Sequence, residues 1–281
     1  MSRVGWIGLG AIGLPMALRL RSAGCGLVAC GHRNVAARDA MAAAGAVLVD
    51  SPRLAAEPAT VVVTVVRDEP QTDAVLLGPD GVLAGLAPGA VLVIMSTLSA
   101  DYCRRIADRC RSLGAEVVDA PVSGGAPAAE RGRLTVMVGG AEAAVERVRP
   151  VLDVLGDPVV RLGEVGSGQL AKIVNNAIKI AILAATTEQL DVAVRAGLDL
   201  DATLRVLRAA SASSRVVQNW DYYYRFKLEH RIGGPLDILQ KDLALALDLA
   251  GQVGVEVPVA STLRGADVGR LISEPSTKEQ L

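Results

Sequence analysis

The sequence predicts a doubly wound α/β domain with a mostly parallel sheet, followed by an all-α domain that a long helix joins to it. Short β-branched runs alternate with alanine-rich helical stretches until Gly163, and apolar residues at helical spacing take over after it. The almost continuous apolar run at 61–66 is typical of a strand that helices cover on both faces. The predicted strands are residues 4–8, 27–30, 60–66, 90–95, 116–119, 134–138 and 159–162.

One long helix is predicted to begin the second domain. From Ser167 to Ala196 the sequence contains no proline and one glycine, Gly168, while apolar residues recur every three or four positions. At 1.5 Å per residue this helix would extend for roughly 45 Å, and Gly197 is placed to end it. The expected domains are therefore residues 1–163 and 164–281. Further helices are predicted at 201–210, 236–252 and 259–272.

Composition argues against two classes of partner. The chain has 29 Lys and Arg against 30 Asp and Glu, so it has no basic excess to attract a nucleic-acid backbone. A membrane span needs about 20 consecutive apolar residues, and no such run is found. We expect a cytoplasmic protein, because the first residues lack the apolar segment of a signal peptide. No metal site and only reduced thiols are expected from the scattered cysteines, which are Cys25, Cys30, Cys103 and Cys110.

A glycine-rich loop connects the first predicted strand to a helix at 14–21. Glycines at this spacing let the backbone turn tightly and approach a pyrophosphate, which free N–H groups at the helix N-terminus stabilise. The context predicts a dinucleotide-binding Rossmann domain, and the alternative is a tight βα turn that binds nothing. The predicted cofactor-binding residues of this loop are Gly8, Leu9, Gly10, Ala11, Ile12 and Gly13.

The end of the second predicted strand indicates which nicotinamide cofactor is used. An NAD site usually carries Asp or Glu there, whereas this chain has His32, Arg33 and Asn34. Arg33 could pair with a 2′-phosphate in bidentate fashion with the other two side chains beside it, so we expect NADP to be preferred over NAD. In the alternative, Arg33 is an ordinary solvated loop residue.

Four segments in order carry a resemblance to one family. They are residues 8–17, with Ile12 where the family pattern has Met, the segment DAPVSGG at 119–125, GSGQLAKIVNN at 166–176, and KDLALALD at 241–248. Together they resemble the β-hydroxyacid dehydrogenases, which include 3-hydroxyisobutyrate dehydrogenase, tartronate semialdehyde reductase and the succinic semialdehyde or glyoxylate reductases. The resemblance spans most of the chain.

The resemblance makes Lys172 the candidate general acid and base, with Asn175 and Asn176 as its catalytic companions. The two asparagines follow three and four residues later, so all three side chains can share one helix face. A partly buried lysine can donate a proton because desolvation lowers its pKa. The residues alone would favour the alternative, a lysine that extends to solvent.

Ser123, Gly124 and Gly125 are predicted to bind a substrate carboxylate, together with Lys172 and Asn176. A hydroxyl and backbone amides without obstructing side chains suit that task, although a glycine-rich turn is the alternative. Ser96 and Thr97 follow the fourth predicted strand at its carboxyl end, where they either contact the cofactor or cap a helix. The resemblance also implies cofactor contacts at Val66 and Lys241. We expect Asp242 and Asp248 to support the fold, by capping or ion pairing.

Three departures from the family pattern bear on specificity. Residues 66–69 bring Arg67, Asp68 and Glu69 to the expected cofactor edge, where the family usually has Leu-Pro. Lys179 adds a second cation two helical turns beyond the catalytic candidate. The aromatic segment at 220–226 could shape the substrate pocket, a subunit interface or simply the core.

These observations predict an NADP-dependent oxidoreductase that interconverts a small hydroxy acid and its semialdehyde or keto acid. Residues 164–281 would form its all-helical substrate and oligomerisation domain, and a homodimer or homotetramer is expected because a long apolar helix leaves surface for neighbouring subunits. An imine reductase-like enzyme and a non-catalytic dinucleotide-binding module are the alternatives. The retained Lys172 argues against both.

Overall fold

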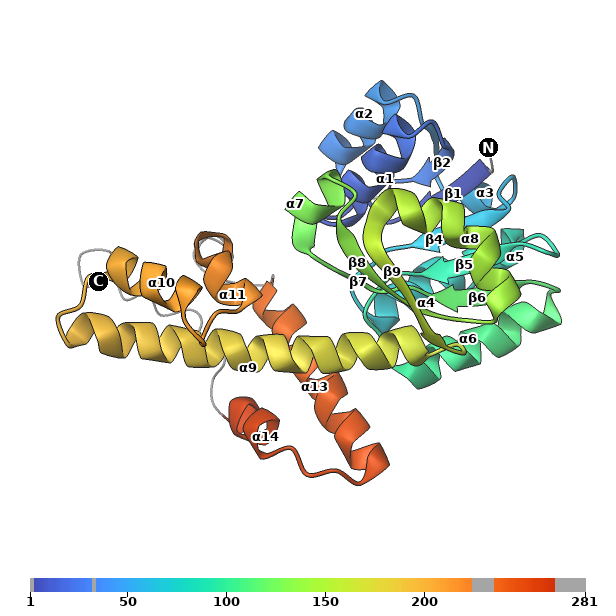
Figure 1. Ribbon diagram of the computed structural model, residues 1–281. Coiled ribbons are helices and arrows are strands. Elements are labelled where there is room, and N and C mark those ends of the chain that lie inside the picture. Colours follow the sequence, from blue (N-terminus) through green and yellow to red (C-terminus); the bar gives the residue numbers. More distant parts are fainter. Residues whose placement is uncertain (1–2, 32–33, 224–234, 266–281) are drawn as a thin grey trace. The chain divides into compact units, whose positions relative to one another are not determined.

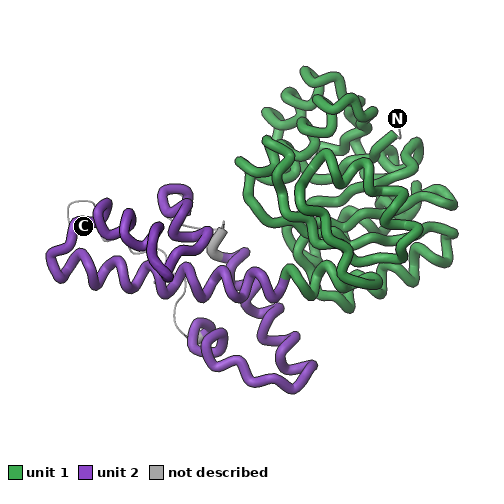
Figure 2. The backbone as a smooth tube through the Cα atoms, in the orientation of Figure 1, with its two compact units in different colours: residues 1–172 green, residues 173–281 purple. Residues whose placement is uncertain are grey.

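The computed structural model describes residues 3–31, 34–223 and 235–265. The chain forms two compact units, residues 1–172 and 173–281 (Figure 2). The point where one unit gives way to the other lies inside a single helix, α9 (Ser167–Arg195). The domain division predicted after residue 163 stays a prediction.

Within the described part of unit 1, nine strands form one sheet in the order β3-β2-β1-β4-β5-β6-β8-β7, with β9 paired to β8 (Figure 1). The first six are parallel, and β8 runs antiparallel to β6 and β7. This arrangement confirms the predicted doubly wound, mostly parallel sheet. The strands are β1 (Arg3–Ile7), β2 (Gly26–Cys30), β3 (Val47–Val49), β4 (Val61–Thr64), β5 (Val91–Ile94), β6 (Glu116–Asp119), β7 (Val122–Ser123), β8 (Leu134–Gly139) and β9 (Gly156–Gly163).

Alternation along the central strands divides their side chains between two apolar cores. Val61 and Val63 of β4 pack in one core with Met16, whereas Val62 packs in the other with Ile106. A strand covered on both faces has no polar side, which explains its apolar sequence. The helices of unit 1 that precede α9 are α1 (Gly13–Ser22), α2 (Val35–Ala43), α3 (Pro52–Ala56), α4 (Glu69–Leu76), α5 (Val82–Gly85), α6 (Ala100–Ser112), α7 (Gly125–Glu130) and α8 (Glu142–Leu155).

The described residues of unit 2 form helices and their connections, which confirms the predicted helical C-terminal region. Gly197 follows α9 with a φ of +91°, and its N–H donates to the Val194 carbonyl, so the predicted end of the long helix is confirmed. Trp220 lies in the core of this unit with Ile180 and Leu243. The other helices are α10 (Leu200–Ala209), α11 (Arg215–Gln218), α13 (Pro235–Val253) and α14 (Pro258–Gly265).

Two short strands, β3 and β7, and the short helix α11 are among the elements that were not predicted. β3 has three residues and β7 has two, and α11 is a single turn, so none is long enough to show a periodic pattern. Of the aromatic segment at 220–226, residues 224–226 lie outside the described residues. None of the described helices is both long and apolar enough to cross a membrane.

The start of α9 is held by a buried carboxylate at the end of β6. Asp119 Oδ1 accepts the Gly166 N–H at 2.7 Å and Oδ2 accepts the Gln169 N–H at 2.8 Å. The approach is close enough that a Cβ on Gly168 would lie 2.4 Å from the Met137 carbonyl oxygen. Burial raises the pKa of Asp119 to about 6, against the lowering effect of these backbone donors. Asp119 therefore joins the sheet to α9 at an electrostatic cost.

Replacing Asp119 by Asn should reveal this cost as a pH dependence of stability. The pKa of Asp119 is raised from 3.8 to about 6, so the folded chain binds more protons than the unfolded chain between these values. The contribution of Asp119 is then fully present below about pH 4 and is lost as the pH rises through about 6. A tenfold change in proton affinity corresponds to about 1.4 kcal/mol, so the loss is on the order of 3 kcal/mol.

The measurement is urea unfolding of the natural chain and of Asp119→Asn from pH 4 to pH 8. The difference in unfolding free energy, natural minus variant, should fall with rising pH and level off above pH 7, because the effect of the amide itself does not titrate. A difference that grows with pH would show that the N–H groups at the helix N-terminus lower the pKa of Asp119 by more than burial raises it.

Candidate functional site

The glycine loop is closed toward the sheet and open on its outer side. Gly8 has a φ of +109°, and a Cβ there would lie 2.0 Å from the Val65 carbonyl oxygen. A Cβ on Gly10 would meet no atom within 4 Å. Ile12, the N-cap residue of α1, makes no side-chain capping hydrogen bond. An exposed helix N-terminus beside an unobstructed glycine fits the pyrophosphate of a dinucleotide.

An arginine of α2 that the sequence did not single out contacts the residue after β2. Arg38 Nη1 donates to the Gly31 carbonyl at 3.4 Å, and its Nη2 lies 3.4 Å from Asp50 Oδ1. The predicted cofactor residue Asn34 is the N-cap of α2, where its Oδ1 accepts the Ala37 N–H at 3.1 Å. The other two predicted residues at this strand end, His32 and Arg33, lie outside the described residues.

Two of the predicted cofactor residues contact each other across neighbouring strand ends. The N–H of Val66, after β4, donates to Ser96 Oγ, after β5, at 2.9 Å. The N-cap of α6 is Ser99, whose Oγ accepts the Tyr102 N–H, so the helix-cap alternative for Ser96 and Thr97 is wrong. Ser96 instead ties together two loops at the sheet edge where a Rossmann cofactor lies.

Two of the charged residues at 67–69, Asp68 and Glu69, form hydrogen bonds within unit 1. Asp68 is the N-cap of α4 and accepts the Gln71 N–H at 2.9 Å. Glu69 Oε1 accepts both the N–H and the hydroxyl of Ser99, at 3.1 and 2.6 Å. Asp68 therefore caps α4 and Glu69 connects α4 with the start of α6, which the sequence pattern did not indicate.

Lys172 is buried in unit 1 and contacts the predicted substrate segment. Only 7% of the residue is exposed, and its Nζ donates to the Val122 carbonyl at 2.5 Å. Val122 and Ser123 form β7, and Gly124 follows with a φ of +140°. The lysine therefore does not extend to solvent, and the structure brings its ammonium to the segment that holds Ser123, Gly124 and Gly125.

Gln169 lies one turn before Lys172 on α9 and was also overlooked. Its Nε2 donates to the Ser96 carbonyl at 2.9 Å, and its Oε1 accepts the Leu98 N–H at 3.0 Å. The residue is fully buried. A polar residue with helical neighbours gives no sign of such contacts in the sequence, because its partners lie about 70 positions away.

Three further site candidates, Asn175, Asn176 and Lys241, form one cluster with Asp242 within unit 2. Asn176 Nδ2 donates to Asp242 Oδ2 at 2.6 Å, and Lys241 Nζ lies 2.9 Å from Asp242 Oδ1. Asn175 Nδ2 donates to Asn176 Oδ1 at 3.0 Å. Burial lowers the pKa of Lys179, and the charge of Asp242 opposes that effect. Asp242 thus orients Asn176 and balances the nearby cations.

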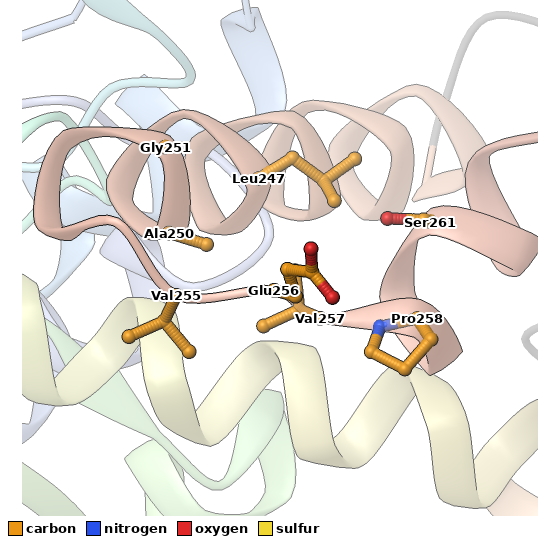
Figure 3. A pocket seen from close by; sticks show the side chains of 8 residues that line it. All are labelled: Leu247, Ala250, Gly251, Val255, Glu256, Val257, Pro258 and Ser261. Carbon is orange, nitrogen blue, oxygen red and sulfur yellow. The ribbon is translucent and has the colours of Figure 1, made fainter.

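A separate cavity of about 340 Å³ lies in unit 2, and none of the predicted site residues lines it. Figure 3 shows its wall, which is mostly apolar and includes one carboxylate, that of Glu256. Its lining residues come from α13, α14 and the segment between them: Leu247, Ala250, Gly251, Val255, Glu256, Val257, Pro258 and Ser261.

Two family models together match nearly the whole chain. Residues 3–166 match the NAD binding domain of 6-phosphogluconate dehydrogenase. Residues 166–266 match the NAD-binding domain of NADP-dependent 3-hydroxyisobutyrate dehydrogenase. The two matches meet at Gly166, whose N–H donates to Asp119 just before α9 begins.

Relatives and solved structures agree with these matches. The chain is 36% identical to an uncharacterized oxidoreductase of Shewanella frigidimarina, over 93% of this chain and 89% of that protein. It is 35% identical to 2-hydroxy-3-oxopropionate reductase of Escherichia coli, over 92% of this chain and 88% of that protein. The crystal structure of 3-hydroxyisobutyrate dehydrogenase from Salmonella typhimurium has a TM-score of 0.83 at 31% identity and covers 97% of this chain and 99% of that one.

Imine reductases of known structure also share the fold, with an identity of 20% in the enzyme from Myxococcus stipitatus, a level that shows the fold alone. Three relatives with identities of 35%, 33% and 32% are named as dehydrogenases or reductases of hydroxy acids. Because both family models and these relatives extend over nearly the full chain, it belongs to the 3-hydroxyisobutyrate dehydrogenase-like β-hydroxyacid dehydrogenases and is an NAD(P)-binding oxidoreductase of hydroxy acids.

Proposed function

We propose that this enzyme uses NADP(H) to interconvert a small hydroxy acid and its semialdehyde or keto acid, with Lys172 as general acid and base. The observation that carries the proposal is the burial of Lys172 with its ammonium against Val122, beside Ser123. A buried ammonium next to hydroxyl and amide donors is suited to a substrate that carries both a reacting oxygen and a carboxylate.

The bound nicotinamide supplies or accepts the hydride. During reduction, Lys172 gives a proton from Nζ to the substrate oxygen as it becomes an alkoxide, and during oxidation the neutral amine takes that proton back. The Val122 carbonyl fixes the direction of Nζ, while Ser123 and the amides of Gly124 and Gly125 bind the carboxylate. Asn175 and Asn176, on the next turn of α9, complete the proposed catalytic group.

The proposed cofactor contacts use mainly backbone in unit 1. The glycine loop at 8–13 receives the pyrophosphate, and residues Val66, Ser96 and Thr97 line the sheet edge beyond it. Lys241 is a further proposed cofactor contact, by resemblance to the family. Preference for NADP rests on Arg33 and its neighbours His32 and Asn34 in the sequence, and Arg38 adds a described guanidinium at the same strand end.

The retained lysine also separates this proposal from an imine reductase-like activity. We expect activity on aldehydes and keto acids that bear a carboxylate, since relatives are named for 2-hydroxy-3-oxopropionate and L-threonate. A panel of small semialdehydes, keto acids and cyclic imines, followed by the loss of NADPH absorbance, tests this directly. Turnover of imines alone would contradict the proposal.

Cofactor preference is tested by parallel kinetics with NADPH and NADH. We expect a higher kcat/KM with NADPH, because a guanidinium pairs with the 2′-phosphate that NADH lacks. Arg33→Ala should weaken NADPH binding more than NADH binding, by about 10-fold or more. Arg131→Ala, in the turn after α7, serves as the matched control for loss of an arginine. Equal or better kcat/KM with NADH in the natural enzyme would overturn the preference.

The role of Lys172 is tested by Lys172→Ala and Lys172→Arg. The alanine variant should lower kcat by roughly 10² to 10⁴, the usual effect of losing a proton-transfer group, with little change in NADPH affinity. The arginine variant keeps the charge but cannot readily release a proton, so it should not restore turnover. Near-native kcat in both variants would show that another group donates the proton. A rise in KM alone would show that Lys172 binds the substrate carboxylate instead.

A homo-oligomer is proposed from an apolar stripe on α9. Val174, Ala181, Ala185 and Val192 fall within about 40° of one another around the helix, and Val174 and Val192 are more than half exposed. Their spacing of seven, four and seven residues reads the same in both directions. Such a stripe is complementary to an antiparallel copy of itself, as a two-fold interface requires.

Light scattering should therefore report a dimer or tetramer of the 29.0 kDa chain at micromolar concentration. Ala185→Glu places a charge near the centre of the stripe and should shift the mass toward the monomer. Val206→Glu, at an exposed position on α10, is the control and should leave the mass unchanged. A monomeric natural chain would contradict the proposal.

A further inference from the structure

We propose that Gln169 is a positioning residue that holds Lys172 in place relative to the loop after β5, which contains Ser96 and Leu98. The inference rests on the proposed role of Lys172 and concerns what holds that lysine in place. Gln169 lies on α9 between the anchored start of the helix and Lys172. Its hydrogen-bond partners Asp119, Ser96 and Leu98 all belong to unit 1, as Gln169 and Lys172 do.

The main chain of Gln169 is fixed from the sheet. Its N–H donates to Asp119 Oδ2 at 2.8 Å, while Gly166 N–H donates to the other oxygen of the same carboxylate. Both Asp119 and Gln169 are fully buried. A charge-assisted pair of hydrogen bonds in a dry environment leaves little freedom to the first turn of the helix.

The side chain of Gln169 is fixed from the loop that follows β5. Its amide group donates to the Ser96 carbonyl and accepts the Leu98 N–H, so it bridges the two residues that flank Thr97. Ser96 in turn accepts the Val66 N–H through its hydroxyl. One glutamine therefore connects two loops of the cofactor edge to the helix that carries the proton donor.

Gln169 lies close to the proposed proton donor along α9. Lys172 follows Gln169 by three residues, which is less than one helical turn, and its Nζ contacts Val122. A shift of the helix relative to the loop would move Nζ away from the reacting oxygen. Misplacement by about 1 Å is known to cost up to 100-fold in rate, so a positioning role is measurable in kcat.

The test compares Gln169→Leu with Gln169→Glu. The leucine variant loses both hydrogen bonds, and its kcat at saturating NADPH and substrate should fall by about 10- to 100-fold. The introduced carboxyl of Gln169→Glu can replace both bonds only when it is protonated. The introduced side chain would lie beside the Cys103 thiol from α6, and Asp119 from β6 binds the N–H of the same residue, so burial and the nearby carboxylate raise its pKa. Its kcat relative to the natural enzyme should therefore recover as the pH falls from 8 to 5.5.

Tyr102→Phe is the matched control, because it removes a buried hydroxyl that donates to Asp73 at 2.7 Å outside this network. It should lower the Tm without changing kcat. If Gln169→Leu behaves in the same way, or if the relative kcat of Gln169→Glu does not depend on pH, Gln169 only stabilises the fold.

A double-mutant cycle with Lys172→Ala separates this inference from the proposed function. If Gln169 acts through Lys172, Gln169→Leu should not lower kcat further once the lysine is gone. An equal loss in both backgrounds would overturn the positioning role. Near-native kcat for Lys172→Ala alone would instead contradict the proposed role of Lys172 in the reaction, independently of the result for Gln169.

Discussion

The hydrogen bonds between Asp119 and the N-terminus of α9 are the interaction on which the functional arrangement depends. The first turn of any helix leaves N–H groups without partners, and here that turn lies against the sheet where water has no access. The carboxylate of Asp119 satisfies the N–H groups of Gly166 and Gln169, and its charge is favourable at the positive end of the helix. Placing a carboxylate there costs desolvation, which its raised pKa reflects.

Once its start is anchored, α9 places its functional residues at regular intervals. Gly166, Gln169, Lys172 and Asn175 follow one another every three residues, so each lies near the preceding one along the helix surface. The first two bind the sheet and its loops, the third contacts β7, and the fourth begins the polar cluster of unit 2. One helix thus carries, in sequence, the residues that anchor it to the sheet, the lysine proposed for proton transfer and the first asparagine of the polar cluster.

Periodicity and composition predicted the strands, the long helix and the glycine loop because these features depend on neighbours in the sequence. β3 and β7 escaped prediction because two or three residues cannot show a period. The burial of Lys172 could not be derived from its helix, since its partner Val122 is 50 positions away. For the same reason Gln169 carried no signal, because its partner Ser96 is 73 positions away. Arg38 contacts the nearby Gly31 carbonyl, but it lies on α2, outside the motif at the end of β2.

The charged residues at 67–69, which depart from the family pattern, have contacts of their own in this fold. Charged residues replace the usual Leu-Pro pair, yet Asp68 caps α4 and Glu69 binds the N-cap residue of α6. That binding holds Ser99 three residues beyond Ser96, in the loop that Gln169 also fixes. The loop after β5 is therefore fastened from two helices, α4 and α9, as well as from its own strand. Preorganised contacts of this kind reduce the free energy that binding must spend on ordering, which suits the cofactor contact proposed for Thr97.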